Sequence, residues 1–176
     1  MRTPWDVARF AASALAGSIE VNGFCRNLFG SDLAIYLGGA GSAYEALPRP
    51  FAVVRLAAAA DGAKPADSVS VSIIVGIDSA TDPATGLRAD LTKPIPAPDG
   101  VLVVGRGRDL AQLVGLVADE ATDALPDCVV EKRSFVYRTG TTPLETAVCV
   151  LAVAPGIGFW NGEDAEIHLN HPPQET

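Results

Sequence analysis

The chain has 176 residues, of which 48% are hydrophobic and 19% charged, and its 13 basic and 21 acidic side chains give a net charge of −8. This acidic balance argues against nucleic-acid binding, because contact with phosphates requires clustered lysine and arginine. No stretch approaches the 18 apolar residues of a membrane span, and the first ten residues lack the pattern of a signal peptide. We therefore expect a cytoplasmic protein that binds neither a membrane nor nucleic acid directly.

The length suits a single domain, since a chain of this size buries roughly 70% of the surface that it exposes when unfolded. The three cysteines, Cys25, Cys128 and Cys149, form no C-x-x-C pair and fit small core thiols in a reducing compartment. The low charged fraction leaves more apolar surface than a monomer of this size usually needs. We therefore expect an oligomer that needs neither a disulfide nor a metal in order to fold.

The first predicted element is a helix from about Thr3 to Ala16. Thr3 can cap it, Pro4 suits the first helical position, and Asp6 lies three residues after the cap. Gly17 can end the helix, and Trp5 is expected to pack in the core. The apolar residues that follow helical spacing are Val7, Phe10, Ala11, Ala14 and Leu15.

The segment from Ser18 to Leu47 gives weaker signals. Phe24 to Phe29 fits either a short helix or a loop, and Leu33 to Leu37 predicts a strand. The glycines from Gly38 onward then break whatever precedes them.

A hairpin is predicted after Pro50, with strands Phe51 to Leu56 and Val69 to Ile77 joined by a turn of small residues. In the second strand, apolar residues alternate with Ser68, Ser70 and Ser72. One face of this sheet is therefore expected to meet water or a polar interface, while a helix covers the other.

The segment 78–100 contains four prolines and four aspartates and is expected to be a long excursion without regular structure. Its aspartates lack the spacing of a calcium loop, and a loop of this length is often an interaction element. An apolar run follows from Val101 to Val104. Asp109 can then cap a second helix, which Leu125 and Pro126 close.

A second hairpin is predicted from Val129 to Arg138 and from Glu145 to Ala154. The latter strand is apolar on both faces, so it must be covered twice. The helices supply one cover, and we expect a neighbouring subunit to supply the other. Beyond Pro155 the glycines and the His171-Pro172-Pro173 sequence indicate a tail or arm.

These elements predict an α+β fold with a mostly antiparallel sheet of two hairpins and two main helices packed on one face. The predicted organisation is one domain over residues 1–154, with the excursion at 78–100 and a C-terminal tail or arm over 155–176.

No set of residues predicts catalysis, a cofactor or a metal site. A nucleophilic serine or cysteine needs a base within reach, and the only histidines, His168 and His171, lie in the predicted tail. With Asp164 and Glu166 they could supply metal ligands, but a structural site wants four ligands on an ordered scaffold. We therefore expect that the protein is not an enzyme.

Three further features have alternative interpretations. Gly38 to Ser42 resembles a phosphate loop but lacks a following lysine, which favours a tight turn. Arg106 and Arg108 precede the second helix, where its N-terminus and two guanidinium groups could hold a carboxylate or phosphate. The same two arginines also fit an exposed turn or a salt bridge to a neighbouring acidic subunit. Trp160 lies between glycines and fits either the core or an exposed anchor for a partner.

The order of elements resembles that of the tail terminator (tail completion) proteins of long-tailed bacteriophages. The resemblance spans roughly Thr3 to Ala154 and includes the strand Pro50 to Leu56, the strand ending in Gly76-Ile77-Asp78, the following helix and the final hairpin. It lies in architecture and carries no residue motif, so no functional residue is transferred.

The resemblance implies a ring of six copies of this chain that caps the tail tube and binds the head or neck connector. The expected partners are therefore copies of itself, the tail-tube protein and the connector protein, first in the host cytoplasm and then in the virion tail. Another neck or tube component of a phage tail fits equally well. The alternative from a different class is a small-molecule or anion-binding α+β domain that uses Arg106 and Arg108.

Overall fold

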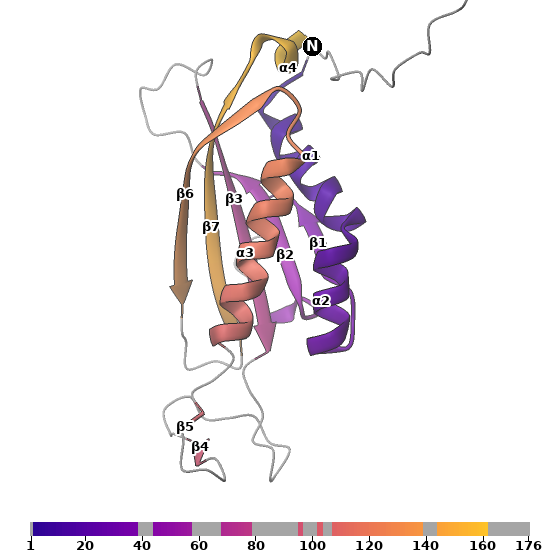
Figure 1. Cartoon of the computed structure of the whole chain (residues 1–176), viewed down its shortest axis with the longest axis vertical. Helices are drawn as coiled ribbons and strands as arrows, with labels where there is room; N and C mark the ends of the chain where they lie inside the picture. Colours follow the sequence, from indigo (N-terminus) through magenta and orange to yellow (C-terminus); the bar gives the residue numbers. More distant parts are fainter. Residues whose placement is uncertain are drawn as a thin grey trace, which may run out of the picture.

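The computed structural model describes residues 2–38, 44–57, 68–78, 95–96, 102–103, 107–138 and 144–161. They form an α+β fold with a five-stranded mixed sheet and helices packed on it (Figure 1). The predicted fold class is confirmed. Three long helices, rather than two, cover the same face of the sheet.

The helices are α1 (Pro4–Gly17), α2 (Ile19–Phe29), α3 (Gly107–Asp123) and the short α4 (Ile157–Asn161), with one 3-10 helix, η1 (Tyr44–Ala46). The large sheet contains β1 (Ala34–Leu37), β2 (Phe51–Leu56), β3 (Val69–Asp78), β6 (Cys128–Arg138) and β7 (Leu144–Pro155). The two-residue strands β4 (Ile95–Pro96) and β5 (Leu102–Val103) pair with each other.

The strand order of the large sheet is β1-β2-β3-β7-β6. Both predicted hairpins are present, because β2 pairs antiparallel with β3 and β6 pairs antiparallel with β7. The contact between β3 and β7 joins them, and β1 adds to β2 as the one parallel pair of this sheet. The two edges of the sheet are therefore β1 and β6.

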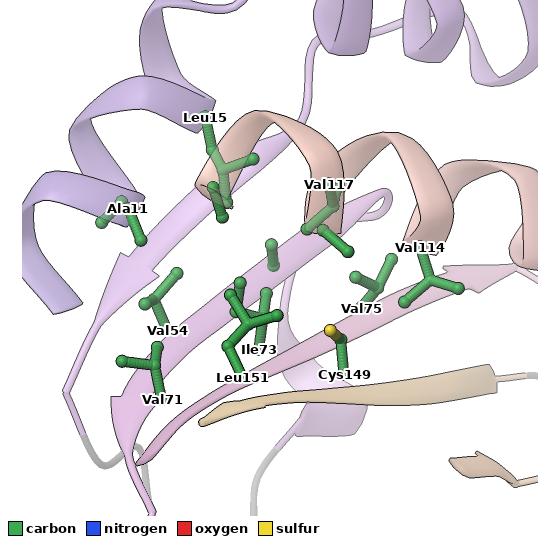
Figure 2. Packing of buried hydrophobic residues seen from close by; sticks show 14 of the residues in the cluster. Ala11, Leu15, Val54, Val71, Ile73, Val75, Val114, Val117, Cys149 and Leu151 are labelled. Atoms are coloured by element: carbon green, nitrogen blue, oxygen red, sulfur yellow. The ribbon is translucent and has the colours of Figure 1, made fainter. Parts of the chain in front are cut away.

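The main core lies between the helices and one face of the sheet (Figure 2). Leu15 of α1 and Val117 of α3 point toward Ile73 of β3 and Leu151 of β7, and all four are fully buried. Each such side chain contributes roughly 1.5–3 kcal/mol when it is removed from water. Residues two apart along a strand point to the same side. Every second residue of β3 and β7 therefore points toward the helices and is buried, which explains the alternation in these strands.

A smaller cluster lies on the opposite face of the sheet. Phe51, Val53 and Ile74 are buried there, and the ring of Tyr44 from η1 stacks on Phe51 with ring centroids 6.3 Å apart. The serine face that the sequence predicts is therefore partly enclosed, and Ser72 is only 4% exposed. The central strands β2 and β3 are thus covered on both sides over much of their length.

The start of α1 follows the prediction. The Thr3 N–H donates a hydrogen bond to the Asp6 carboxylate at 2.7 Å, and the Thr3 hydroxyl donates another at 3.0 Å. These two hydrogen bonds stabilise the charged carboxylate and so lower the pKa of Asp6, and the bond from the Thr3 N–H has the larger effect. Trp5 differs from expectation: it is 50% exposed, because the buried side of the helix starts at Val7.

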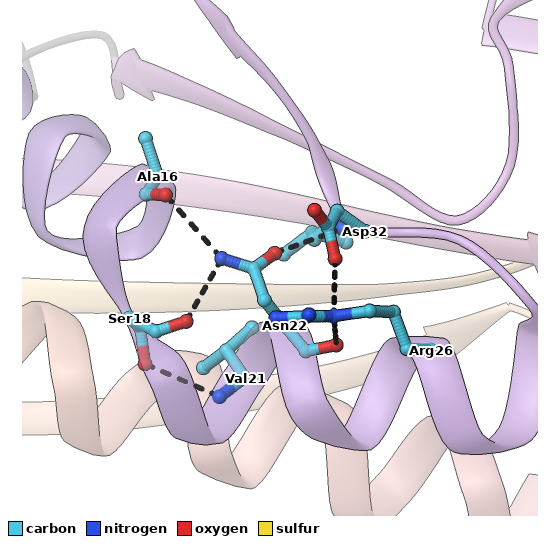
Figure 3. Close-up of polar contacts among 7 residues, drawn as sticks. Ala16, Ser18, Val21, Asn22, Arg26 and Asp32 are labelled. Carbon is cyan, nitrogen blue, oxygen red and sulfur yellow. Dashed lines mark hydrogen bonds and ion pairs between the residues drawn. The ribbon is translucent and has the colours of Figure 1, made fainter.

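The segment that gave weak sequence signals forms α2, held by a buried asparagine (Figure 3). The Asn22 side-chain amide donates to the carbonyls of Ser18 and Ala16 at 2.8 and 3.3 Å, and its oxygen accepts the Leu33 N–H at 3.1 Å. The Ser18 hydroxyl oxygen also accepts the Val21 N–H at 3.2 Å, so Ser18 caps α2. One side chain thereby joins the end of α1, the start of α2 and the approach to β1.

Two predicted boundaries are wrong. The helix α3 begins at Gly107, so Asp109 lies in its first turn rather than at the cap, where a carboxylate is also favoured by the helix dipole. The sequence predicts that the segment 78–100 is irregular, yet Asp78 ends β3 and residues 95–96 form β4. The other residues of the excursion lie outside the described ranges.

The C-terminal part of the fold extends further than expected. The sequence predicts a tail from residue 155, but Pro155 ends β7 and α4 follows, with Phe159 completely buried. The Asp127 carboxylate accepts the Phe159 N–H at 3.1 Å, and the Asp127 carbonyl accepts the Gly156 N–H at 2.7 Å. The described domain therefore reaches Asn161, and the rest of the predicted tail lies outside the described residues.

Candidate assembly surface

The outer strand β6 is the most exposed regular element of the sheet. It is 11 residues long and pairs with β7 along one side. Within the part of the chain that the structure describes, no strand pairs with its other side (Figure 1). An edge strand of this length offers a row of backbone N–H and C=O groups to a strand from another molecule.

Three consecutive hydrophobic residues near the end of β6 lie largely in solvent. Phe135 is 41% exposed, Val136 51% and Tyr137 50%. Natural edge strands are usually protected by charges, bulges or prolines, and the exposed run has none of these within it. An exposed apolar edge of this kind predicts association with another chain.

The other half of β6 carries protection. Its pairing with β7 shifts register between Val130 and Lys132, which marks a β-bulge. Lys132 and Arg133 follow directly, and Arg133 forms an ion pair with Asp119 of α3. Because charges and bulges discourage strand pairing, the segment open to a partner is the regular part near Phe135 to Tyr137.

The strand β7, which the sequence marks as apolar on both faces, is an inner strand. Its helix-facing residues are buried. Its residues on the opposite face, Val148, Val150, Ala152 and Ala154, remain partly exposed. This second face is therefore only partly covered by the part of the chain that the structure describes.

The opposite edge of the sheet is shorter. The strand β1 has four residues and pairs with β2 on one side, with no second partner strand among the described residues. Its last residue, Leu37, is 48% exposed, while Ile35 and Tyr36 are partly buried. Within the described ranges, the sheet therefore has two edges without a partner strand, each with apolar residues.

The described structure does not test the predicted anion site of Arg106 and Arg108, because it describes only one of the two arginines. Arg108 lies exposed in the first turn of α3, and Arg106 falls outside the described residues. The Gly38 to Ser42 turn also falls outside, apart from Gly38, which has a φ of 105°. His168 and His171 lie outside as well.

Trp160 lies on α4, partly buried and packed against the main core. Its ring meets that of Phe159 edge to face at 5.2 Å, and its carbonyl accepts the Arg2 N–H at 3.1 Å. Part of the Trp160 side chain therefore contributes to the core, as one of its two interpretations predicts. Its role as an anchor for a partner stays a prediction.

The cysteines are poor nucleophiles. Burial raises the pKa of Cys25 to about 12 and the pKa values of Cys128 and Cys149 to about 11. Among the described residues, no group of three or more His, Cys, Asp or Glu side chains could hold a metal ion. None of the helices in the described ranges combines the length and apolar character needed to cross a membrane.

Sequence reasoning did not single out Phe135, Val136 and Tyr137. The run of three apolar residues could have drawn attention to them, because successive side chains of a strand point to opposite faces and such a run is therefore apolar on both. The sequence cannot tell which strand of a hairpin is the outer one.

No protein-family model matches the chain, and no curated protein matches it.

Proposed function

We propose that this protein is a structural subunit that assembles with copies of itself through the β6 edge. The observation that carries the proposal is the unprotected run Phe135 to Tyr137 on an 11-residue edge strand. Pairing that edge with another chain satisfies the outward backbone groups and removes three large apolar side chains from water. The partly exposed back face of β7 adds apolar surface beside it.

We further propose that the assembly is a ring that acts as a phage or prophage tail terminator, capping the tail tube and joining it to the head or neck. The support for this assignment is the order of elements, in which the hairpin β2-β3, the helix α3 and the hairpin β6-β7 follow the N-terminal helices and β1, together with an edge suited to self-association. A ring requires each copy to present two different surfaces, and the two open sheet edges provide them.

The proposal predicts that the purified protein has a solution mass of several times 18.2 kDa, or forms such an oligomer when tail-tube protein is added. Val136→Lys should shift the protein to the monomer, because a lysine on an edge strand opposes strand pairing. The measurement is light scattering behind size exclusion over a concentration series.

Ile157→Lys is the matched control, since Ile157 is 80% exposed but lies on α4. It should leave the mass unchanged. A wild-type protein that stays at 18.2 kDa at every concentration, with or without tail-tube protein, would remove the basis of the proposal.

A further inference from the structure

The two apolar edges of the sheet lie at the same level along the strands. Phe135 of β6 pairs with Cys149 of β7, which pairs with Ile73 of β3. Ile73 pairs with Val54 of β2, and Val54 pairs with Leu37 of β1. Phe135 and Leu37 are therefore the two ends of one row that crosses the whole sheet, and both are largely exposed.

The neighbouring rows match in the same way. Following the pairs across the sheet, Val136 shares a row with Tyr36, and Tyr137 shares a row with Ile35. All side chains of one row lie on the same face of the sheet, because cross-strand partners point to the same side. Phe135 thus lies on the same face as Leu37, and Val136 on the same face as Tyr36.

The strand directions also suit a repeated contact. β1 runs parallel to β2, and each later step across the sheet, to β3, β7 and β6, is antiparallel. β6 therefore runs opposite to β1. If copies repeat by rotation about an axis along the strands, the β6 edge of one copy meets the β1 edge of the next as an antiparallel pair, with no shift along the axis.

Charge favours this pairing over β6 against β6. The strand β6 contains Lys132, Arg133 and Arg138 against Glu131, a net charge of +2, so two copies of β6 side by side bring like charges together. The strand β1 has no charged residue and follows Asp32. The residues outside β6 hold ten of the 13 basic and 20 of the 21 acidic side chains, so the rest of the chain carries a net charge of −10, opposite in sign to that of β6.

We propose that the β6 edge of one copy pairs antiparallel with the β1 edge of the next, with Phe135 beside Leu37, so that the sheet continues from subunit to subunit. This inference rests on the proposed self-assembly and specifies its contact. The contact is heterologous, since it joins two different edges, so repeating it builds a ring when the rotation between copies closes, and never a twofold dimer.

The test is disulfide cross-linking between Leu37→Cys and Phe135→Cys under mild oxidation. Within one chain, these positions are four strand spacings apart, roughly 19 Å, which is too far for a disulfide. Mixing the two single variants should therefore give a cross-linked dimer, and the double variant should give a ladder of covalent multimers. The wild type is the background control, because desolvation raises the pKa values of its three thiols to about 11 to 12, although Cys128 on β6 is only partly buried.

A second pair controls for random encounters. Val129→Cys, 66% exposed and at the other end of β6, should not cross-link to Leu37→Cys. Dimers from Phe135→Cys alone, without a gain on mixing, would overturn the inference in favour of a β6 to β6 contact. Oligomers by light scattering with no specific cross-link would overturn this contact alone, whereas a monomeric wild type would overturn the proposed self-assembly as well.

Discussion

Phe159→Ala is expected to lower the free energy of unfolding by about 4 kcal/mol, the cost of removing a fully buried phenylalanine and leaving a cavity. The ring of Phe159 is completely buried and lies edge to face against Phe10 at 6.2 Å. The guanidinium carbon of Arg2 lies 5.3 Å from the centre of the same ring. The substitution therefore loosens both ends of the described chain, and denaturant unfolding at one fixed protein concentration measures it.

Ile157→Ala is the matched control for this effect. Ile157 is on the same short helix but is 80% exposed, so its loss should change the free energy of unfolding by less than about 0.5 kcal/mol. Equal effects of the two substitutions would mean that α4 does not dock on the domain.

Gly76→Ala is expected to cost about 3 kcal/mol, because the site has no room for a methyl group. A β-carbon at Gly76 would lie 2.3 Å from Cζ and 2.4 Å from Cε1 of Phe51. The ring of Phe51 is completely buried and stacked on Tyr44, so it cannot move aside without disturbing the second cluster. Thermal or denaturant unfolding should show the loss directly.

A glycine with free space serves as the comparison. Gly115 lies inside α3, and a β-carbon there would meet no atom within 4 Å. Gly115→Ala should therefore stabilise the protein by about 0.5–1 kcal/mol through helix propensity. If Gly76→Ala, like Gly115→Ala, did not lower the free energy of unfolding, the ring of Phe51 would not pack against Gly76 as described.

The fold was predictable from the sequence wherever one periodicity dominated. Thr3, Pro4 and Asp6 marked the start of α1, and the alternation from Val69 to Ile77 marked β3 and its partner. In these segments, capping residues and hydrophobic spacing point to the same element. The hairpins and their antiparallel pairing follow from such local patterns.

Other features depend on contacts distant in sequence. The helix α2 is fixed by Asn22, whose oxygen accepts a hydrogen bond from Leu33, and its own pattern is too short to reveal this. The docking of α4 depends on Asp127, 32 residues before Phe159. The exposed edge of β6 depends on the strand order, because β7 could equally have been the outer strand. Local patterns carry no information on these choices.

The most direct test of the account is hydrogen–deuterium exchange of β6 at protein concentrations below and above the assembly transition. Backbone amides of β6 that face away from β7 have no partner strand in the described structure, so they should exchange quickly in the monomer and slowly in the assembly. Peptides from α3 should exchange at the same rate at both concentrations, because this helix packs on a face of the sheet and not along the outer edge of β6. If the mass rises with concentration while the exchange of β6 stays fast, the β6 edge is not the assembly surface.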